Sequence, residues 1–216
     1  MKTLFKVLFG LAALLMAYLC VMSIYVPVSF THKQEKREGL IQKRLKDIAS
    51  YEQAYKAVHG KFANGDELIN FLENGDLYYV VAEGDFTDEM REKGLTEQQA
   101  AAQGLIKRDT VRVRAKDSLL NSREDINSIK EILEVPGFSP NRIEIEEGHI
   151  QQVIGVDTIN VSVFRAQVPM TVYLQGMDEN IVKERITEAK SRNNGNGYPG
   201  LRIGSLEEFK LTGNWE

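Results

Sequence analysis

The side chains that most often carry chemistry in proteins are sparse in this chain and scattered along it. The three histidines, His32, His59 and His149, lie in separate segments, and none has a Cys, Asp or Glu partner in a known metal motif. There is no Gly-x-Ser-x-Gly elbow, phosphate-binding glycine loop or dinucleotide fingerprint. Neighbouring acids such as Glu146 and Glu147 would point to opposite faces of a strand. We therefore expect no catalytic site, no metal site and no cofactor.

Two features leave the chemistry partly open. Carboxylates far apart in the sequence could still converge in space, so an enzyme or metal-binding domain without a linear motif stays an alternative. In the Gly- and Asn-rich loop 192–200, oxygens of Asn193, Asn194 and Asn196 could ligate Ca²⁺, which takes six to eight oxygens. The loop contains no aspartate, so an ordinary turn is the simpler interpretation.

The strongest signal is an uncharged apolar run at residues 7–30. As a helix rising about 1.5 Å per residue it would reach roughly 36 Å, enough to cross a hydrocarbon core of about 30 Å. We predict that residues 1–30 form a membrane anchor. A cleaved signal peptide, cut near Val21-Met-Ser23, stays an alternative, although its apolar core would be shorter. A lipoprotein signal would need a small residue before Cys20, where Leu19 stands, and a soluble core helix would have a polar face.

The orientation of the anchor rests on two opposing observations. Lys2 and Lys6 precede the apolar run as in an exported signal-anchor protein, which predicts an inner-membrane protein with a periplasmic C-terminal domain. Six Lys or Arg residues between positions 33 and 46 argue for the reverse topology under the positive-inside rule. We favour export and keep the reverse topology as the alternative.

Charge and cysteine content limit the classes of partner. Residues 31–61 hold eight Lys or Arg and four Asp or Glu, whereas residues 62–216 hold 17 and 27. An acidic domain of this kind is a poor partner for nucleic acid. The only cysteine, Cys20, lies in the anchor, so the rest of the chain has no disulfide.

Residues 31–61 are predicted to continue the anchor as an amphipathic juxtamembrane helix that stops at Gly60. Its apolar residues recur every three or four positions and form a possible interaction stripe: Ile41, Leu45, Ile48, Tyr51 and Tyr55. We expect this stripe to pack on the domain that follows, with a partner helix as the alternative.

Residues 62–216 are predicted to form a soluble α+β domain with a mainly antiparallel sheet and several short helices. Helices are expected after a capping box at Asn64–Glu67, after Ser122 and over 178–191. One or two surface helices are expected over 85–104. The expected strands are a buried one at 77–81, a half-exposed one at 110–115, a hairpin of 142–146 and 149–154 turning at 147–148, and strands at 159–163, 170–174 and 201–203. Arg112 and Arg114 would share an outer face able to bind an acidic partner, and Trp215 is expected to plug the core.

The front of the chain resembles type IV pilins and pseudopilins. The order of anchor, amphipathic helix and then Ala-Tyr-Lys-Ala-Val-His-Gly-Lys-Phe at 54–62 is similar to theirs, as are Tyr-Pro-Gly at 198–200 and Gly-Asn-Trp at 213–215. This resemblance implies a subunit of a pilus or secretion machine. The pilin processing signal and its early glutamate are absent. The chain is also similar to a family of short membrane-anchored bacterial envelope proteins that share Arg-Leu-Lys-Asp-Ile, here 44–48.

Together these observations predict a single-pass membrane-anchored envelope protein that acts through protein–protein contacts without catalysis. Its expected partners are the membrane and other envelope proteins, with no nucleic acid. A pilin-like subunit and an enzyme or metal-binding domain without a linear motif are the alternatives.

Overall fold

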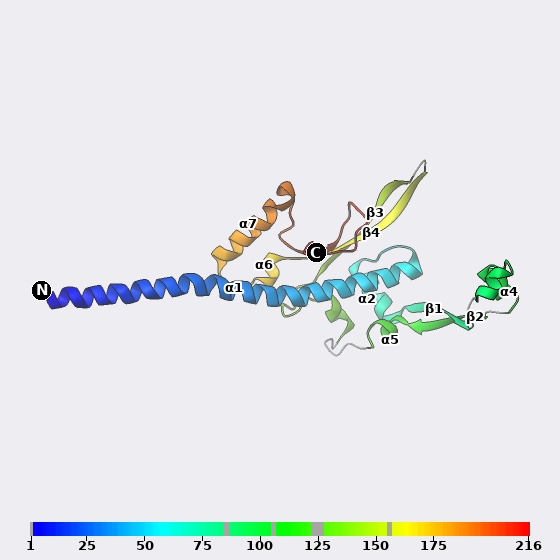
Figure 1. Cartoon of the computed structure of the whole chain (residues 1–216), viewed down its shortest axis with the longest axis horizontal. Helices are drawn as coiled ribbons and strands as arrows, with labels where there is room; N and C mark the ends of the chain where they lie inside the picture. The colour runs from blue at the N-terminus through cyan, green and yellow to red at the C-terminus, as the bar shows by residue number, and fades with distance from the viewer. Residues whose placement is uncertain (1, 84–86, 105–106, 122–127, 155–156) are drawn as a thin grey trace. The chain divides into compact units, whose positions relative to one another are not determined.

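The structure, a computed structural model, describes residues 2–83, 87–104, 107–121, 128–154 and 157–216. It is an α+β protein with one long N-terminal helix and two small antiparallel sheets (Figure 1). Its helices are α1 (Lys2–His59), α2 (Gly65–Asn74), α3 (Asp88–Glu92), α4 (Glu97–Ala102), α5 (Ala115–Leu119), the 3₁₀ helix η1 (Ile129–Leu133), α6 (Met170–Tyr173) and α7 (Glu179–Gly195). Its strands are β1 (Asp76–Glu83), β2 (Lys107–Arg114), β3 (Glu144–Ile154), β4 (Asp157–Pro169) and β5 (Gly200–Gly204).

The chain forms two compact units. The first unit comprises Met1–Ala49, Leu133–Ile145 and Arg165–Glu216. The second unit comprises Ser50–Ile132 and Glu146–Phe164. The division into 1–30, 31–61 and 62–216 expected from the sequence follows other boundaries and stays a prediction.

Helix α1 runs without a break from Lys2 to His59, with Pro27 inside it. It ends where the sequence predicts, at Gly60. The φ angle of Gly60 is 77°, a left-handed conformation that glycine adopts without strain. The Gly60 N–H donates to the Lys56 carbonyl at 2.8 Å, which satisfies one of the last carbonyls of the helix.

The first unit is organised around β4 and β5. Their register runs from Arg165 opposite Gly204 to Pro169 opposite Gly200. Arg37 of α1 donates from Nη1 to the carbonyls of Tyr173 (2.9 Å) and Gln175 (3.0 Å), which ties α6 to α1. The fully buried apolar side chains of this unit include Ile41, Leu45, Ile48, Leu133, Val135, Ala166, Val168, Tyr173, Leu174 and Ile203.

The segment 170–174 forms α6, so the strand predicted there is wrong. Strand β4 ends at Pro169, which has no N–H to donate to a ladder and occupies the N-cap position of α6. The Met170 N–H donates to the Pro199 carbonyl at 2.9 Å. The proline therefore overrides the strand-like residues that follow it.

The capping box that opens α2 in the second unit is confirmed. Asn64 Oδ1 accepts from the N–H groups of Asp66 (3.1 Å) and Glu67 (3.0 Å), and Glu67 Oε2 accepts from the Asn64 N–H (3.1 Å). The helix then buries Leu68, Ile69, Phe71 and Leu72 on one side. The spacing of those apolar residues is why this short segment is helical.

Strands β1 and β2 pair antiparallel, from Asp76 opposite Arg114 to Glu83 opposite Lys107. The prediction of a buried strand at 77–81 is correct in position but wrong in burial. Leu77 is buried, whereas Tyr78, Tyr79, Val80 and Val81 are 45–65% exposed. A run of apolar residues indicates a strand but not what covers it, and β1 pairs with β2 alone among the described strands.

The hairpin predicted around residues 147–148 is also wrong. Residues 144–154 form one continuous strand, β3, which is adjacent to β4 in a sheet of order β3-β4-β5. Glu147-Gly148 lacks the Asn-Gly or Asp-Gly signature of a tight hairpin turn. Arg142 instead forms an isolated bridge with Glu134.

The helices expected over 85–104 are confirmed as α3 and α4. Thr96 and Gln99 exchange the reciprocal cap bonds expected of them, from the Thr96 N–H to Gln99 Oε1 (2.9 Å) and from the Gln99 N–H to Thr96 Oγ1 (3.3 Å). The cap predicted at Ser122 lies outside the described residues, and the segment that follows is the 3₁₀ helix η1 rather than an α-helix. Helix α7 and strand β5 lie where the sequence predicts.

Candidate functional site

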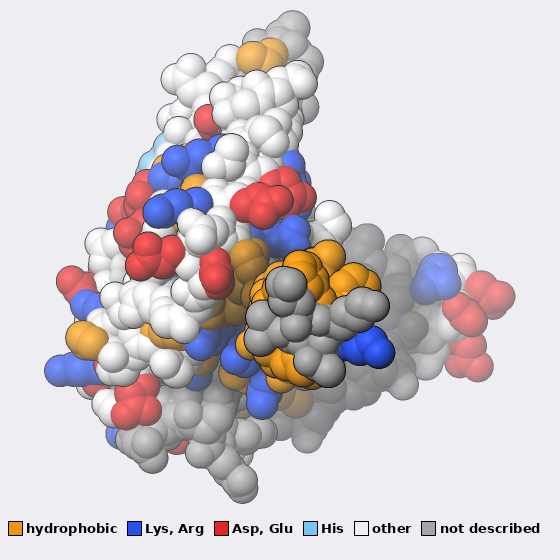
Figure 2. All heavy atoms as spheres, turned by 90° about the vertical axis from the view of Figure 1, so that its left-hand side faces the viewer, with side chains coloured by type: hydrophobic (Ala, Val, Ile, Leu, Met, Phe, Trp, Pro, Cys, Tyr) orange, Lys and Arg blue, Asp and Glu red, His pale blue; other side chains and the backbone are white. Residues whose placement is uncertain are grey.

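The first half of α1 is an uncovered apolar helix. From Phe5 to Val28 nearly every side chain is exposed, including Phe5 at 70% and Phe9 at 79%. Figure 2 faces the N-terminal end of the chain and shows hydrophobic side chains gathered around this helix. It is the one helix in the described part of the chain that is long and apolar enough to cross a membrane. A core helix of a soluble protein would bury these residues, so a lipid surface fits them better.

The predicted interaction stripe lies further along the same helix and is buried. Ile41, Leu45 and Ile48 have no exposed surface, and Tyr51 and Tyr55 are 4% and 6% exposed. These side chains therefore contribute to the chain's own interior. Binding of a partner helix by this face stays a prediction, and it would require the face to be uncovered first.

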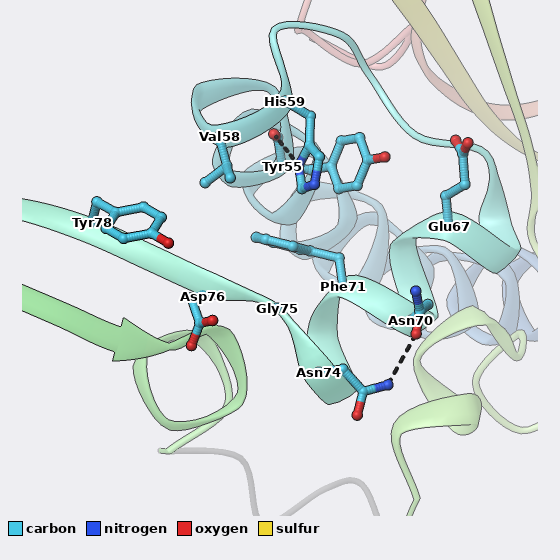
Figure 3. Close-up of a pocket in the computed structure, with 10 residues that line it drawn as sticks. All are labelled: Tyr55, Val58, His59, Glu67, Asn70, Phe71, Asn74, Gly75, Asp76 and Tyr78. Carbon is cyan, nitrogen blue, oxygen red and sulfur yellow. Dashed lines mark hydrogen bonds between the residues drawn. The ribbon is translucent and has the colours of Figure 1, made fainter.

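The second unit contains a pocket of about 500 Å³ where the end of α1, helix α2 and the start of β1 meet (Figure 3). Three rings form its wall. The rings of Tyr55 and His59 stack with centroids 4.1 Å apart, and Phe71 meets them edge-on at 5.2 Å and 5.7 Å. Such edge-on and stacked contacts add to the free energy of burial. The pocket therefore has a fixed aromatic wall.

Three polar side chains of this aromatic pocket form hydrogen bonds or ion pairs within the chain. Glu67 caps α2 and accepts from Lys61 Nζ at 3.1 Å, and these bonds lower its pKa. Asp76 pairs with Arg112, which lowers the pKa of Asp76. His59 Nδ1 donates to the Tyr55 carbonyl at 3.2 Å. The lining of the pocket holds no arrangement of nucleophile and base.

A buried carboxyl group lies close to this pocket on α1. Glu52 is fully buried, and its Oε2 accepts from the Ala63 N–H at 2.8 Å. Burial raises the pKa of Glu52 to about 8 despite this bond, and the negative charges of Glu147 and Glu67 add to the rise. Glu52 Oε1 and Glu147 Oε2 are buried without a hydrogen-bond partner among the described atoms. Burial therefore favours the protonated, neutral form of Glu52 in the folded chain.

The β1–β2 ribbon of the second unit has two chemically different faces. Opposite pairs share a face, so Leu77 lies with Val113 and Tyr79 with Val111, while Val81 on the same face is paired with Asp109. We call this the apolar face of the ribbon. Tyr79, Val81 and Val111 are 42–46% exposed there.

The other face, which we call the basic face, carries Arg112 and Arg114, as predicted from their spacing, together with the exposed Tyr78 and Val80. Arg112 is bonded to Asp76, and its side chain is still 68% exposed. Arg114 is also exposed. The two arginines therefore share an exposed face as predicted, and binding of an acidic partner by this face stays a prediction.

The remaining candidates stay separate. His32 and His149 are exposed on α1 and β3, and no group of three His, Cys, Asp or Glu side chains suited to a metal occurs in the described chain. Asn193 and Asn194 have φ angles of 50° and 56°, so their loop is a left-handed turn at the end of α7. Trp215 is half-buried, and its ring lies against Gly213.

Sequence reasoning missed Glu52 and the aromatic pocket. Glu52 lies next to Tyr51 on the buried side of α1. The sequence signal that could have revealed it was a single acidic residue within an apolar stripe. The pocket combines Tyr55 and His59 of one helix with Phe71 of the next, and no local pattern predicts that contact.

No family model matches this chain, and no curated protein and no solved structure matches it.

Proposed function

We propose that this chain is a single-pass inner-membrane protein whose periplasmic α+β domain binds another envelope protein. The observation that carries the proposal is the uncharged part of α1 from Val7 to Val28, whose apolar side chains have no cover in the folded chain. Burial of this apolar surface in a bilayer would stabilise the anchored state by about 25 cal/mol per Å². The amphipathic part of α1 would then hold the domain at the membrane surface.

The ribbon is the surface best suited to bind the protein partner. A two-stranded ribbon is marginally stable alone, and this one exposes large apolar residues in water. Strand β2 pairs only with β1 among the described strands, so its other edge can accept a further strand.

The two faces of the ribbon specify the chemistry of that strand. A strand added beside β2 would place alternate side chains over the apolar face and over the basic face. Its apolar residues would cover Val111 and Val113, and its acidic residues would lie beside Arg112 and Arg114. We therefore propose an extended segment of alternating apolar and acidic residues as the partner.

Charge reversal at Arg114 is expected to weaken this contact about tenfold, because like charges would then face each other across the added strand. A photo-crosslinking amino acid at Val111 reports the contact in intact cells. The control is Lys116→Glu, a charge reversal at another exposed position two residues away in α5. Arg114→Gln should give a smaller loss than Arg114→Glu.

The predicted result is one crosslinked adduct that Arg114→Glu removes and Lys116→Glu leaves intact. An adduct equally strong in both variants, or monomer alone, would contradict the proposed contact.

The pilin-like subunit is the second candidate, and the continuity of α1 from the apolar segment into the domain favours it. Pilin-like packing would bring copies of this chain together. An adduct of twice the chain mass would therefore support it over binding of a different protein.

A further inference from the structure

The first unit contains a polar cavity of about 470 Å³ that the proposed function does not use. Side chains from α1, from α7 and from the C-terminal segment line it, among them Gln34, Arg185, Asn193, Arg202, Asn214 and Trp215. We call it the α7 cavity. Its volume falls in the range of about 300–1,000 Å³ that is usual for sites of small molecules.

Planar hydrogen-bonding groups dominate the lining, and several are held in place. Glu188 accepts from Arg185 Nη1 at 3.1 Å and from Arg192 Nη2 at 3.2 Å, one bond to each carboxylate oxygen. A guanidinium has five N–H donors, so each arginine keeps further donors for a ligand. Asn214 is fixed by its bonds to the Gly200 carbonyl (2.9 Å) and the Arg202 N–H (3.0 Å).

Close backbone packing builds the rim of the cavity. A Cβ atom at Gly197 would lie 1.9 Å from the Ala189 carbonyl oxygen, so only glycine allows the loop to approach α7 there. The left-handed Asn193 and Asn194 turn the chain just before it. The loop position is therefore set by backbone geometry rather than by the polar side chains themselves.

Half-buried aromatic rings stand among these donors. The Arg202 guanidinium lies over the Tyr198 ring at 5.5 Å from its centroid, and burial raises the pKa of Tyr198 to about 12. Tyr198 therefore stays a neutral phenol at physiological pH. Trp215 is half-buried against Gly213. Aromatic rings of this kind offer a flat apolar surface beside polar groups.

The charges of the lining balance. Four basic side chains (Arg185, Arg192, Arg202 and Lys210) occur with four acidic ones (Glu38, Glu188, Glu208 and Glu216). Glu38 accepts from Tyr173 Oη at 3.0 Å and from Gln34 Nε2 at 2.8 Å, and Glu216 pairs with Lys46 at 2.7 Å. A charged ligand would gain little from a balanced lining, whereas an uncharged ligand with many hydroxyl groups would meet donors, acceptors and rings.

We propose that the α7 cavity binds a saccharide of mono- or disaccharide size. Its hydroxyl groups would bond to the amide and guanidinium groups, and a C–H face of a sugar ring would stack on an aromatic ring. This site requires no contribution from the ribbon.

The cavity also lies close to the apolar segment within the same unit. Gln34, Glu38 and Gln42 of its lining follow residue 30 by four to twelve positions, or about 6–18 Å along a helix. If the apolar segment spans the bilayer, this places the cavity near the headgroups, and this part of the inference rests on the proposed anchoring. The sugar could then be a glycolipid headgroup as well as a soluble glycan.

Trp215 makes the proposal directly testable, because it is the only tryptophan of the chain. The full-length protein is purified in a detergent without a sugar headgroup, and tryptophan emission is followed during titration. The probes are chitobiose, maltose, and phosphatidylcholine vesicles with and without monoglucosyl diacylglycerol, with inorganic phosphate as the anion probe.

Asn193→Gly and Asn194→Gly form a matched pair. Both residues are left-handed, so glycine leaves the backbone unstrained, but only Asn193 lines the cavity. Loss of the Asn193 amide should raise the dissociation constant about tenfold, and loss of the Asn194 amide should leave it unchanged.

A saturable emission change with a sugar probe, weakened only by Asn193→Gly, supports the proposal. Preference for the glycolipid vesicles over both soluble sugars would identify a membrane source, and the reverse preference a soluble one. No saturable change with any sugar, equal affinities in the two variants, or a response to phosphate alone would overturn it. Because the soluble sugars need no bilayer, failure of the anchoring proposal would leave this result unaffected.

Discussion

Replacing Glu52 by glutamine is expected to stabilise the folded chain at pH 8 and to remove most of the pH dependence of its stability. Glu52 is fully buried, and only one of its oxygens has a partner, the Ala63 N–H. Glutamine keeps a carbonyl oxygen for that bond and carries no charge at any pH. The variant therefore removes the cost of ionising a buried carboxyl while the packing stays nearly the same.

The raised pKa of Glu52 determines how the stability of the folded chain changes with pH. Burial moves the pKa of Glu52 from 4.5 to about 8 in the folded chain. The folded state therefore retains a proton that the unfolded state releases, and stability is lost as the pH rises from about 4.5 to about 8. The loss is on the order of 5 kcal/mol at 1.4 kcal/mol per pKa unit. Below pH 4.5 the wild type and Glu52→Gln should be equally stable.

The charged groups that surround Glu52 come from three segments. Glu147 of β3 and Glu67 of α2 raise its pKa. Lys61 bridges those two acids, with Nζ 3.1 Å from Glu67 and 3.6 Å from Glu147. Burial is the main cause of the rise in the pKa of Glu52, and the charges of the two acids add to it.

Urea unfolding of the full chain in detergent micelles, followed by far-UV circular dichroism at pH 5 and pH 8, measures this difference. The control is Glu35→Gln, the same substitution at an exposed position of α1, which should leave the stability and its pH dependence unchanged. If Glu52→Gln loses stability between pH 5 and pH 8 as steeply as the wild type, Glu52 is not the buried acid responsible.

The substitution Ile48→Asp is expected to abolish cooperative folding. Ile48 is on the buried face of α1 and has no exposed surface. Removal of a buried isoleucine side chain alone costs about 2–5 kcal/mol, and a buried carboxylate without a partner adds to that cost. The sum approaches the whole stability of a typical domain, about 5–15 kcal/mol.

Leu40→Asp provides the matched control, because Leu40 lies on the same helix and is 54% exposed. Thermal unfolding should show a cooperative transition for Leu40→Asp and none for Ile48→Asp. A cooperative transition within a few degrees of the wild type for Ile48→Asp would mean that this face of α1 is not buried in solution.

Local signals in the sequence predicted the ends of several elements. The Asn64 and Thr96 capping boxes and the Gly60 stop depend on contacts within one helical turn, so the residues themselves suffice. The predictions failed where the outcome depends on distant parts of the chain. Strand β3 runs through Glu147-Gly148 because β4 lies beside it. The segment that forms α6 is a different case, because Pro169 directly before it was a local signal in the sequence.

The candidate sites also divide into those that local sequence predicts and those that depend on contacts between distant segments. The apolar segment of α1 is readable from sequence because its length and lack of charge suffice. Exposure of Val81 and Val111, burial of Glu52, and convergence of Asn193 with Trp215 depend on which segments meet. A pattern of apolar residues predicts a strand with a buried face, even where no other segment of the fold packs on that face.

The central claim is that the first part of α1 anchors the chain in the membrane with its domain exported. A periplasm-active reporter fused to the C-terminus, combined with membrane fractionation and protease treatment of spheroplasts, tests it most directly. The account predicts an active reporter on a full-length, membrane-retained chain whose domain is digested by external protease. An inactive reporter on a protected C-terminus, or an active one on a shorter chain released from the membrane, would contradict it.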